Sequence, residues 1–210
     1  MNKFYINLDS DINRRKKFIN TDYIRWRATP REEVSDELDK KMISCHNYPR
    51  KSHLGRCGCF HSHISLLQHI VKHKLNDVLI VEDDAVLIND LPTDYPQSSI
   101  TYVGGFIHHQ KMTNNKPVKI SLNDGFQLVP EGYRILMTMS YIVPNYVVAE
   151  EILYCILSSK RYRAIDVMLG NINIDRPYVY YPACFEEEGV VSTIQQKRRK
   201  ATTNYEWIKY

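Results

Sequence analysis

The strongest constraint on the fold is a run of four apolar residues, 78–81, that is followed at once by the acidic residues Glu82, Asp83 and Asp84. A run that is apolar at every position is typical of a central strand that is buried on both faces of a sheet. The stretch before it has an amphipathic helical stripe, formed by Ile64, Leu66, Leu67, Ile70 and Val71. The sequence therefore predicts a helix from about residue 62 to 74 that leads into a buried strand.

Other segments have the composition of strands. β-Prone residues next to turn-forming residues predict strands at residues 4–8, 100–103, 141–143 and 178–181. We expect Gly104 and Gly105 to stop the second of these strands, and Pro182 to close the last. Residues 107–134 are expected to be irregular.

Two more helices are expected. One follows the turn at residues 9–11 and contains Arg14 and Arg15. The other follows Asn145, which can cap it, and its apolar face consists of Val148, Ile152, Ile156 and Leu157. Residues 30–56 lack periodicity and predict a loop, with at most a short helix between Glu32 and Ile43.

This order of elements predicts the fold class. Strands that alternate with helices indicate an α/β sandwich with a largely parallel central sheet. The chain has 210 residues, of which 43% are hydrophobic, and this is enough for one sizeable core. No repeat or linker divides the chain, so we expect one domain over residues 1–195 and a basic tail over residues 196–210.

Composition also predicts the environment of the protein. No window approaches the roughly 18 consecutive apolar residues of a membrane helix. The chain begins Met1-Asn2-Lys3-Phe4 and enters a predicted strand rather than the apolar core of a signal peptide. Five cysteines, an odd number without regular spacing, argue against a disulfide framework. We therefore expect a soluble, cytoplasmic protein.

The charge limits the classes of partner. A net charge of +4 is too small to indicate nucleic-acid binding by charge alone, so no nucleic-acid partner is expected. Much of the excess lies in the tail, in Lys197, Arg198, Arg199 and Lys200. This run is either a solvated terminus or a weak contact with a membrane surface or a partner. The oligomeric state stays open.

The acidic triplet is the main candidate for chemistry, because ligands of open α/β sheets bind beyond the carboxyl ends of the strands. In an extended segment Glu82 and Asp84 point to one side and Asp83 points to the other. Adjacent carboxylates repel one another, and a hard ion such as Mn²⁺ or Mg²⁺ would relieve the repulsion. The alternative is a solvated turn after a strand.

Three motifs resemble those of glycosyltransferase family 25, which contains lipooligosaccharide and collagen galactosyltransferases. Ile6-Asn7-Leu8-Asp9, followed by Arg14-Arg15, is similar to the opening strand and paired arginines of that family. Gly58-Cys59-Phe60-His61-Ser62-His63 is similar to its Gly-Cys-x-x-Ser-His motif, and Leu79-Ile80-Val81-Glu82-Asp83-Asp84-Ala85 to its strand and acidic triplet. A weaker match continues through Ser140-Tyr141-Ile142-Val143, Ala164-Ile165-Asp166, Tyr181-Pro182 and Ser192-Thr193-Ile194.

The resemblance implies a fold and an activity. It implies one nucleotide-binding domain of the GT-A type and an inverting transfer of a hexose, galactose or glucose, from a UDP-sugar. The acceptor would be a hydroxyl of a glycan, a glycolipid or a protein. Two departures leave the donor and the acceptor open: Arg56 stands where the family often has a glutamate, and Phe185-Glu186-Glu187 replaces a stretch that contains a glutamine.

The resemblance also implies roles for individual residues. Mn²⁺ or Mg²⁺ would be bound by Asp84 and Glu82, with Asp83 assisting. The base that deprotonates the acceptor would be Asp166, which as an alternative would only cap a helix, with Glu186, Glu187 and Glu188 as further candidates. The donor would be contacted by residues of all three motifs, namely Asn7, Leu8, Asp9, Arg14, Arg15, Ser62, His63, Glu82 and Asp83.

Three other interpretations compete. A cluster of thiols and imidazoles could bind structural zinc, and it consists of Cys45, His46, His53, Cys57, Cys59, His61 and His63. A metal-dependent phosphoesterase or nuclease could use the same acidic triplet, with His108 and His109 as added ligands. Finally, the chain could bind a nucleotide sugar without turning it over.

Overall fold

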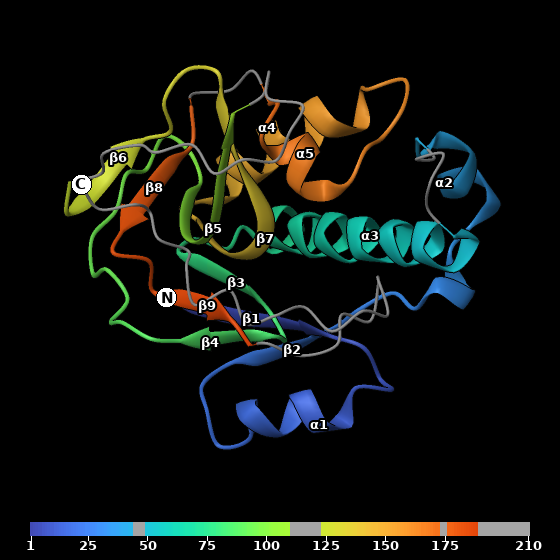
Figure 1. Ribbon diagram of the computed structural model, residues 1–210, viewed down its shortest axis with the longest axis horizontal. Helices are drawn as coiled ribbons and strands as arrows, with labels where there is room; N and C mark the ends of the chain where they lie inside the picture. The colour runs from blue at the N-terminus through green and yellow to red at the C-terminus, as the bar shows by residue number, and fades with distance from the viewer. Residues whose placement is uncertain (44–48, 110–122, 173–175, 189–210) are drawn as a thin grey trace.

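The fold is built on one seven-stranded sheet with the strand order β2-β1-β3-β7-β5-β8-β6 (Figure 1). The computed structural model describes residues 1–43, 49–109, 123–172 and 176–188. The strands of this sheet are β1 (Asn2–Asn7), β2 (Ile24–Arg27), β3 (Val78–Glu82), β5 (Thr101–His109), β6 (Gly125–Leu128), β7 (Tyr133–Val143) and β8 (Tyr178–Tyr181). A small second sheet pairs β4 (Ala85–Leu87) with β9 (Phe185–Glu187).

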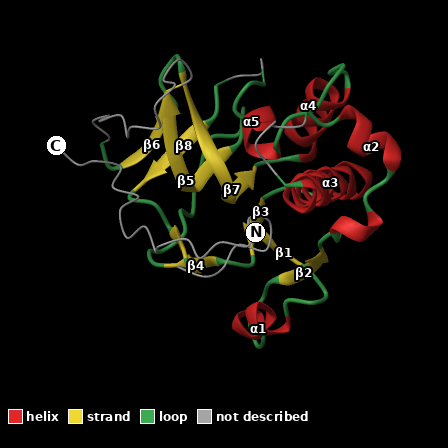
Figure 2. Cartoon of the chain, turned by 45° about the vertical axis from the view of Figure 1, so that its right-hand side comes forward, coloured by secondary structure: helices red, strands yellow, loops and turns green. Residues whose placement is uncertain are grey.

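Helices cover both faces of the large sheet (Figure 2). The long helix α3 (Arg50–His73) lies on one face together with α4 (Tyr146–Leu157) and α5 (Ile165–Leu169). The short helix α1 (Ile12–Arg15) and the 3₁₀ turn η1 (Lys16–Phe18) lie on the other. The remaining helical segments, η2 (Arg31–Glu33) and α2 (Asp36–Lys41), connect β2 to α3.

Strand β3 is the centre of the core, as predicted. Its four apolar residues have no exposed surface. Val78 and Ile80 pack in the cluster that includes α3 and α4, whereas Leu79 and Val81 pack in the cluster on the opposite face. Burial on both faces explains why every position of this strand is apolar.

The sheet is mixed, and the prediction of a largely parallel sheet holds only for part of it. β1 is parallel to β2 and β3, and β5 is parallel to β8. β7 lies antiparallel between β3 and β5, and β6 is antiparallel to β8. Parallel neighbours need a crossover connection, usually a helix. The described residues between β5 and β7 contain no helix, and these two strands pair antiparallel.

Helix α3 begins at Arg50, so the prediction of a start near residue 62 was wrong. Its first half buries the polar or small residues Ser52, His53 and Gly58. The first half of the helix is therefore packed in the interior without an apolar stripe in its sequence. As a result Ser62 and His63 lie in the middle of the helix rather than at its start. The short helix expected between residues 32 and 43 is confirmed as α2.

The glycines at 104 and 105 do not stop a strand, contrary to the prediction. β5 continues through them to His109, with irregular register on either side of Gly104. Gly105 has a φ of 129°, and a Cβ there would lie 2.8 Å from Ile135 Cγ2. The pair therefore forms a bulge that needs glycine.

The segment expected to be irregular, residues 107–134, contains the end of β5, all of β6 and the start of β7. Strand β2 was also not predicted. Its sequence, IRWR, is short and carries two arginines, so it lacks an apolar pattern. Residues 110–122 lie outside the described part of the chain.

Other predictions are confirmed. β1, α1 and β8 occupy the expected segments. Asn145 caps α4, since its Oδ1 accepts a hydrogen bond of 3.0 Å from the Val148 amide. Within the described segments, no helix is long and apolar enough to cross a membrane. The basic tail and the motif at residues 192–194 lie outside the described residues.

Candidate active site

A cavity of about 780 Å³ opens where the parallel strands β1, β2 and β3 end. One wall comes from the loops after β1 and β2, another from α3, and the floor from the acidic triplet. This is the edge at which α/β sheets bind ligands. The lining residues used below are Leu8, Asp9, Arg14, Arg27, Ala28, Thr29, Pro30, Arg31, Cys59, Ser62, His63, Glu82, Asp83 and Asp84.

Within the triplet, Asp83 is tied to the protein. It is buried, and its two oxygens accept hydrogen bonds of 2.7 Å from Asn7 Nδ2 and 2.8 Å from Arg14 Nη1. Burial raises the pKa of Asp83, although Arg14 and Asn7 act in the opposite direction. These bonds anchor the end of β3 to β1 and α1.

Asp84 also lines the cavity, but its carboxylate is held less tightly than that of Asp83. Its Oδ2 lies 3.6 Å from Arg14 Nη1. Burial and the negative charge of Glu82 raise the pKa of Asp84 to about 7. Glu82 lines the cavity as well, and its Oε1 accepts a hydrogen bond of 2.6 Å from Thr138 Oγ1. Two carboxylates that repel each other in this way form a set that suits a divalent cation.

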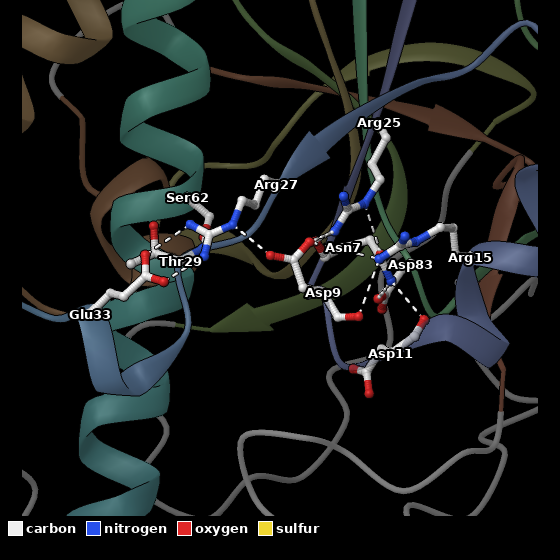
Figure 3. Close-up of polar contacts among 10 residues, drawn as sticks. All are labelled: Asn7, Asp9, Asp11, Arg15, Arg25, Arg27, Thr29, Glu33, Ser62 and Asp83. Atoms are coloured by element: carbon white, nitrogen blue, oxygen red, sulfur yellow. Dashed lines mark hydrogen bonds and ion pairs between the residues drawn. The ribbon is translucent and has the colours of Figure 1, made fainter.

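Asn7 is a buried hub rather than part of the cavity wall (Figure 3). In addition to the bond to Asp83, its Oδ1 accepts hydrogen bonds from Arg15 Nε at 3.2 Å and Arg25 Nε at 3.1 Å. With its polar atoms bonded inside the protein, Asn7 positions the end of β1. Arg15 does not line the cavity either, whereas Arg14 does.

Asp9 organises the rim of the cavity through a network of arginines (Figure 3). Its carboxylate accepts hydrogen bonds from Arg25 at 2.5 Å and from Arg27 at 2.7 Å. These bonds lower the pKa of Asp9 to about 2. Arg27 also forms a two-pronged ion pair with Glu33 in η2. The network joins the ends of β1 and β2 to η2.

Two residues of α3 that lie one turn apart, Gly58 and Ser62, hold the loop after β2 close to the helix. A Cβ on Gly58 would lie 2.4 Å from the Thr29 carbonyl oxygen, so only glycine permits this approach. Ser62 Oγ accepts a hydrogen bond of 2.8 Å from the Thr29 amide and donates one of 2.7 Å to the Gly58 carbonyl. Gly58 and Ser62 therefore fix the position of the cavity wall.

Cys59 and His63, the cysteine and the last histidine of the Gly-Cys-x-x-Ser-His motif, line the cavity next to Glu82. His63 is fully buried, its Nδ1 lies 2.9 Å from the Tyr141 hydroxyl, and its Nε2 lies 3.4 Å from Glu82 Oε1. One potential ligand atom from each of Cys59, His63 and Glu82 lies within 4.8 Å of the others. Burial and the negative charges of Glu82, Asp166 and Asp84 raise the pKa of the Cys59 thiol.

The candidate bases come from α5 and from the segment that contains β9. Asp166 is in the first turn of α5, whose N-cap is Ala164, so the prediction that it could be the N-cap was wrong. Its Oδ2 accepts from the Met137 amide at 3.2 Å and its Oδ1 from the Val167 amide at 2.8 Å. Asp166 does not line the cavity, but its charge acts on Cys59.

The three glutamates near the end of the described chain take different positions. Glu187 is buried, and its negative charge contributes to the raised pKa of Asp84. Glu186, its neighbour in β9, is half-buried and points to the opposite side of the strand. Glu188 pairs with Lys17. The backbone amide of Glu188 also donates a hydrogen bond of 2.7 Å to the Asp84 carbonyl oxygen, so this segment is attached to the acidic triplet.

The thiol and imidazole cluster that suggested zinc is divided between two places. His53 and Cys57 form a group with Asp39 of α2, whereas Cys59 and His63 face the cavity. His61 Nδ1 lies 2.8 Å from Thr29 Oγ1. Cys45 and His46 lie outside the described residues. Because α3 separates these side chains, a single site does not form among the described members of the cluster.

Several site residues were not predicted from the sequence. Ala28, Thr29, Pro30 and Arg31 line the cavity because β2 leads into it, and β2 itself was not predicted. Tyr141 and Thr138 of β7 contact His63 and Glu82. The sequence signal for these two residues was a hydroxyl side chain within a largely apolar segment. In the structure Tyr141 is 0% and Thr138 is 2% exposed, so both hydroxyl groups need partners inside the protein.

Comparison with protein families identifies the family of this chain. The sequence profile of glycosyltransferase family 25, described as an LPS biosynthesis protein, matches residues 1–146. This segment contains β1, β2, α3 and β3, and so every described residue that lines the cavity. No curated protein matches the chain in sequence.

Proposed function

Because the chain belongs to glycosyltransferase family 25 and is a glycosyltransferase, we propose that the cavity at the ends of β1, β2 and β3 binds a UDP-sugar for inverting transfer of a hexose, galactose or glucose. The acceptor is a hydroxyl of a glycan, a glycolipid or a protein. The observation that carries this proposal is the meeting of Arg14, Glu82 and Asp84 in one cavity. A GT-A type fold over residues 1–195, with a separate tail at 196–210, is part of the same proposal.

The nucleoside fits the part of the cavity that the first two strands form. Leu8 and Asp9 follow β1, and residues 28–30 follow β2, so loops from two neighbouring parallel strands form this wall. The Asp9 carboxylate, held by Arg25 and Arg27, is positioned to accept hydrogen bonds from ribose hydroxyls. Ser62 holds the Thr29 segment in place.

The diphosphate fits between this wall and the acidic triplet. Arg14 lines the cavity with its guanidinium already oriented by Asp83, which leaves a fixed positive charge near Asp84. An arginine that is oriented before binding loses little side-chain freedom when a phosphate oxygen arrives. Asn7 and Arg15 act indirectly by holding this corner together.

Glu82 and Asp84 are the residues that would hold Mn²⁺ or Mg²⁺. Burial, followed by the negative charge of Glu82, raises the pKa of Asp84 to about 7, and a bound cation would offset both effects. Two carboxylates leave positions for water and phosphate oxygens, which is the usual arrangement for these ions. When bound, the ion supplies Lewis-acid stabilisation of the charge that develops on the leaving diphosphate.

Inverting transfer also requires a base that accepts the proton of the attacking hydroxyl. Asp166 is the first candidate, because its carboxylate is held by two backbone amides and acts on Cys59 at the cavity floor. Glu187 is the second, because it is buried and acts on Asp84. Glu186 is the least suitable, since it points away from Glu187.

The test is a screen of nucleotide sugars for donor hydrolysis in the presence of Mn²⁺, with the wild type and Asp84→Asn. We expect one donor to release its nucleotide, and the variant to lose that release. Asp90→Asn is the matched control, because Asp90 is exposed beyond β4. Equal release by the wild type and Asp84→Asn would contradict the role of Asp84. Folded wild-type protein that turns over no donor, with or without carbohydrate acceptors, would contradict the proposed donor class.

A further inference from the structure

Cys59 and His63 are placed to act together with Glu82. They are four residues apart on α3, so their side chains leave the same face of the helix, one turn apart. This face meets the end of β3, where Glu82 is the last residue. A thiol, an imidazole and a carboxylate therefore come within 4.8 Å of one another at the floor of the cavity.

The distance between two of these groups is that of two ligands on one metal ion. Zn²⁺ binds imidazole nitrogen and carboxylate oxygen at about 2.0–2.2 Å in tetrahedral sites, which separates the two ligand atoms by about 3.3–3.5 Å. His63 Nε2 lies 3.4 Å from Glu82 Oε1. This contact does not form a hydrogen bond, and Nε2 is a buried nitrogen without a hydrogen-bond partner among the described residues.

The outer contacts orient both groups toward the same point. The Tyr141 hydroxyl lies 2.9 Å from His63 Nδ1, which leaves Nε2 directed at the cavity. Thr138 Oγ1 donates to Glu82 Oε1 at 2.6 Å. Metal-binding histidines and carboxylates typically have such supporting hydrogen bonds. Tyr141 and Thr138 both belong to β7, so one rigid strand positions two ligands.

We propose that Cys59, His63 and Glu82 bind a Zn²⁺-class divalent ion whose fourth ligand position faces the cavity. A ligand set with a thiolate and an imidazole selects softer ions than the carboxylate pair Glu82 and Asp84. Three protein ligands and one open position are typical of catalytic rather than structural zinc sites. Binding displaces the Cys59 thiol proton to solvent.

The other group of similar composition on α3 is a weaker candidate. In that group, Asp39 already accepts two hydrogen bonds from Arg50, at 2.6 and 2.5 Å. Its oxygen Oδ1 also lies 2.9 Å from His53 Nε2. An ion there would have to displace the guanidinium of Arg50 from Asp39.

The test is metal binding by chelator-treated full-length protein, which needs no donor or acceptor. Zn²⁺ is titrated to obtain stoichiometry and affinity, and Co²⁺ is used as a spectroscopic substitute, since a thiolate ligand gives a charge-transfer band in the near ultraviolet. We expect one ion per chain and a clear thiolate band. Cys59→Ser should remove the band and weaken Zn²⁺ binding by more than about tenfold, the scale seen even for loss of outer contacts.

Cys57→Ser and Cys155→Ser are the matched controls, and both should keep the band and the affinity. Loss of the band in Cys57→Ser with its retention in Cys59→Ser would overturn the proposal and place the ion at Asp39 and His53. A wild type that binds Co²⁺ without a thiolate band, or binds no ion, would also overturn it, and this result holds even if Cys59→Ser does not fold. The proposed donor can fail in the hydrolysis screen while this site is confirmed, so the two outcomes are separable.

Discussion

Helix α3 contributes a thiol and an imidazole to each of two groups that also contain a carboxylate, and the surroundings of the two groups differ. Asp39, His53 and Cys57 meet between α2 and the first half of α3, whereas the second group meets at the cavity and consists of Cys59, His63 and Glu82. In the first group the carboxylate is neutralised by an arginine, Arg50. In the second it accepts from a neutral hydroxyl.

This difference decides what each group can do. With Arg50 as a partner, the carboxylate of Asp39 is satisfied within the protein, and the pKa of Asp39 is lowered. At the cavity, the negative charges of Glu82, Asp166 and Asp84 accumulate around Cys59 instead. Residue type alone therefore does not identify a binding site, and the charges around each group have to be considered as well. The first group should matter for stability and the second for activity.

The largest expected effect is on turnover. Glu82→Gln keeps the size of the side chain and removes the charge that both proposed cation sites use. Because metal stabilisation is worth several kcal/mol, we expect kcat to fall by about 10²–10³-fold. Asp39→Asn, the equivalent change in the other group, should leave kcat within about twofold, since it changes no cavity residue. Equal losses in both variants would refute the division between the groups.

The next effect is on stability, and here the group at Asp39 should matter more than the group at the cavity. His53 is 4% exposed and its ring packs at the junction of α2 and α3. We expect His53→Ala to lower the free energy of unfolding by about 2–3 kcal/mol, through lost packing and the lost contact of the imidazole with the Asp39 carboxylate. Chemical denaturation measures this change. Donor turnover well below the melting temperature should persist in His53→Ala and be lost in His63→Ala; the opposite pattern would show that the two groups have been assigned the wrong way round.

A smaller effect concerns the support of the cavity group. Tyr141→Phe removes the hydroxyl that lies 2.9 Å from His63 Nδ1 and leaves the rest of the strand unchanged. Loss of such an outer contact typically weakens metal affinity by about 10–100-fold. Zn²⁺ titration of this variant should show the weaker binding with unchanged stoichiometry. Tyr102→Phe is the control, because Tyr102 is an equally buried tyrosine of the neighbouring strand β5; similar weakening there would indicate a general packing effect.

The sequence predicted the part of the site that lies next to the buried strand. The apolar run before Glu82 fixed a central strand, and the position after it placed Glu82 and Asp84 at the ligand-binding edge. Local pattern was sufficient because both the strand and its acidic end are continuous in the chain. Asp83 and Asp84 lie in the turn after β3, so the difference between them comes from the hydrogen bonds of Asp83 with Asn7 and Arg14 and not from strand alternation.

The remainder of the site depends on contacts between distant segments. Asn7 was expected to contact the donor, but hydrogen bonds from Arg15 and Arg25 make it a buried hub, and only the fold brings these residues together. The first half of α3 has no apolar stripe because it buries Ser52 and His53. The insertion of β7 between β3 and β5 likewise has no local signal, since pairing partners are not encoded by the pattern of one strand.

The smallest expected effect is the pH dependence of the group at Asp39. Hydrogen bonds from Arg50 lower the pKa of Asp39 below its usual value of 3.8 in the folded state. Near that pH the unfolded chain binds more protons than the folded protein, so the stabilisation is complete above about pH 4 and is lost as the pH falls further.

Arg50→Gln should therefore flatten the acid side of the stability profile, measured by thermal unfolding from about pH 6 down to about pH 3. The change should be small, because Arg50 is 63% exposed and exposed ion pairs contribute little. Added salt should reduce it further. Lys51→Gln removes a neighbouring exposed charge on the same helix and serves as the control. If the two variants flatten the profile equally, net charge explains the effect. The ion pair between Arg50 and Asp39 would then make no specific contribution to stability, and it could not distinguish this group from the one at the cavity.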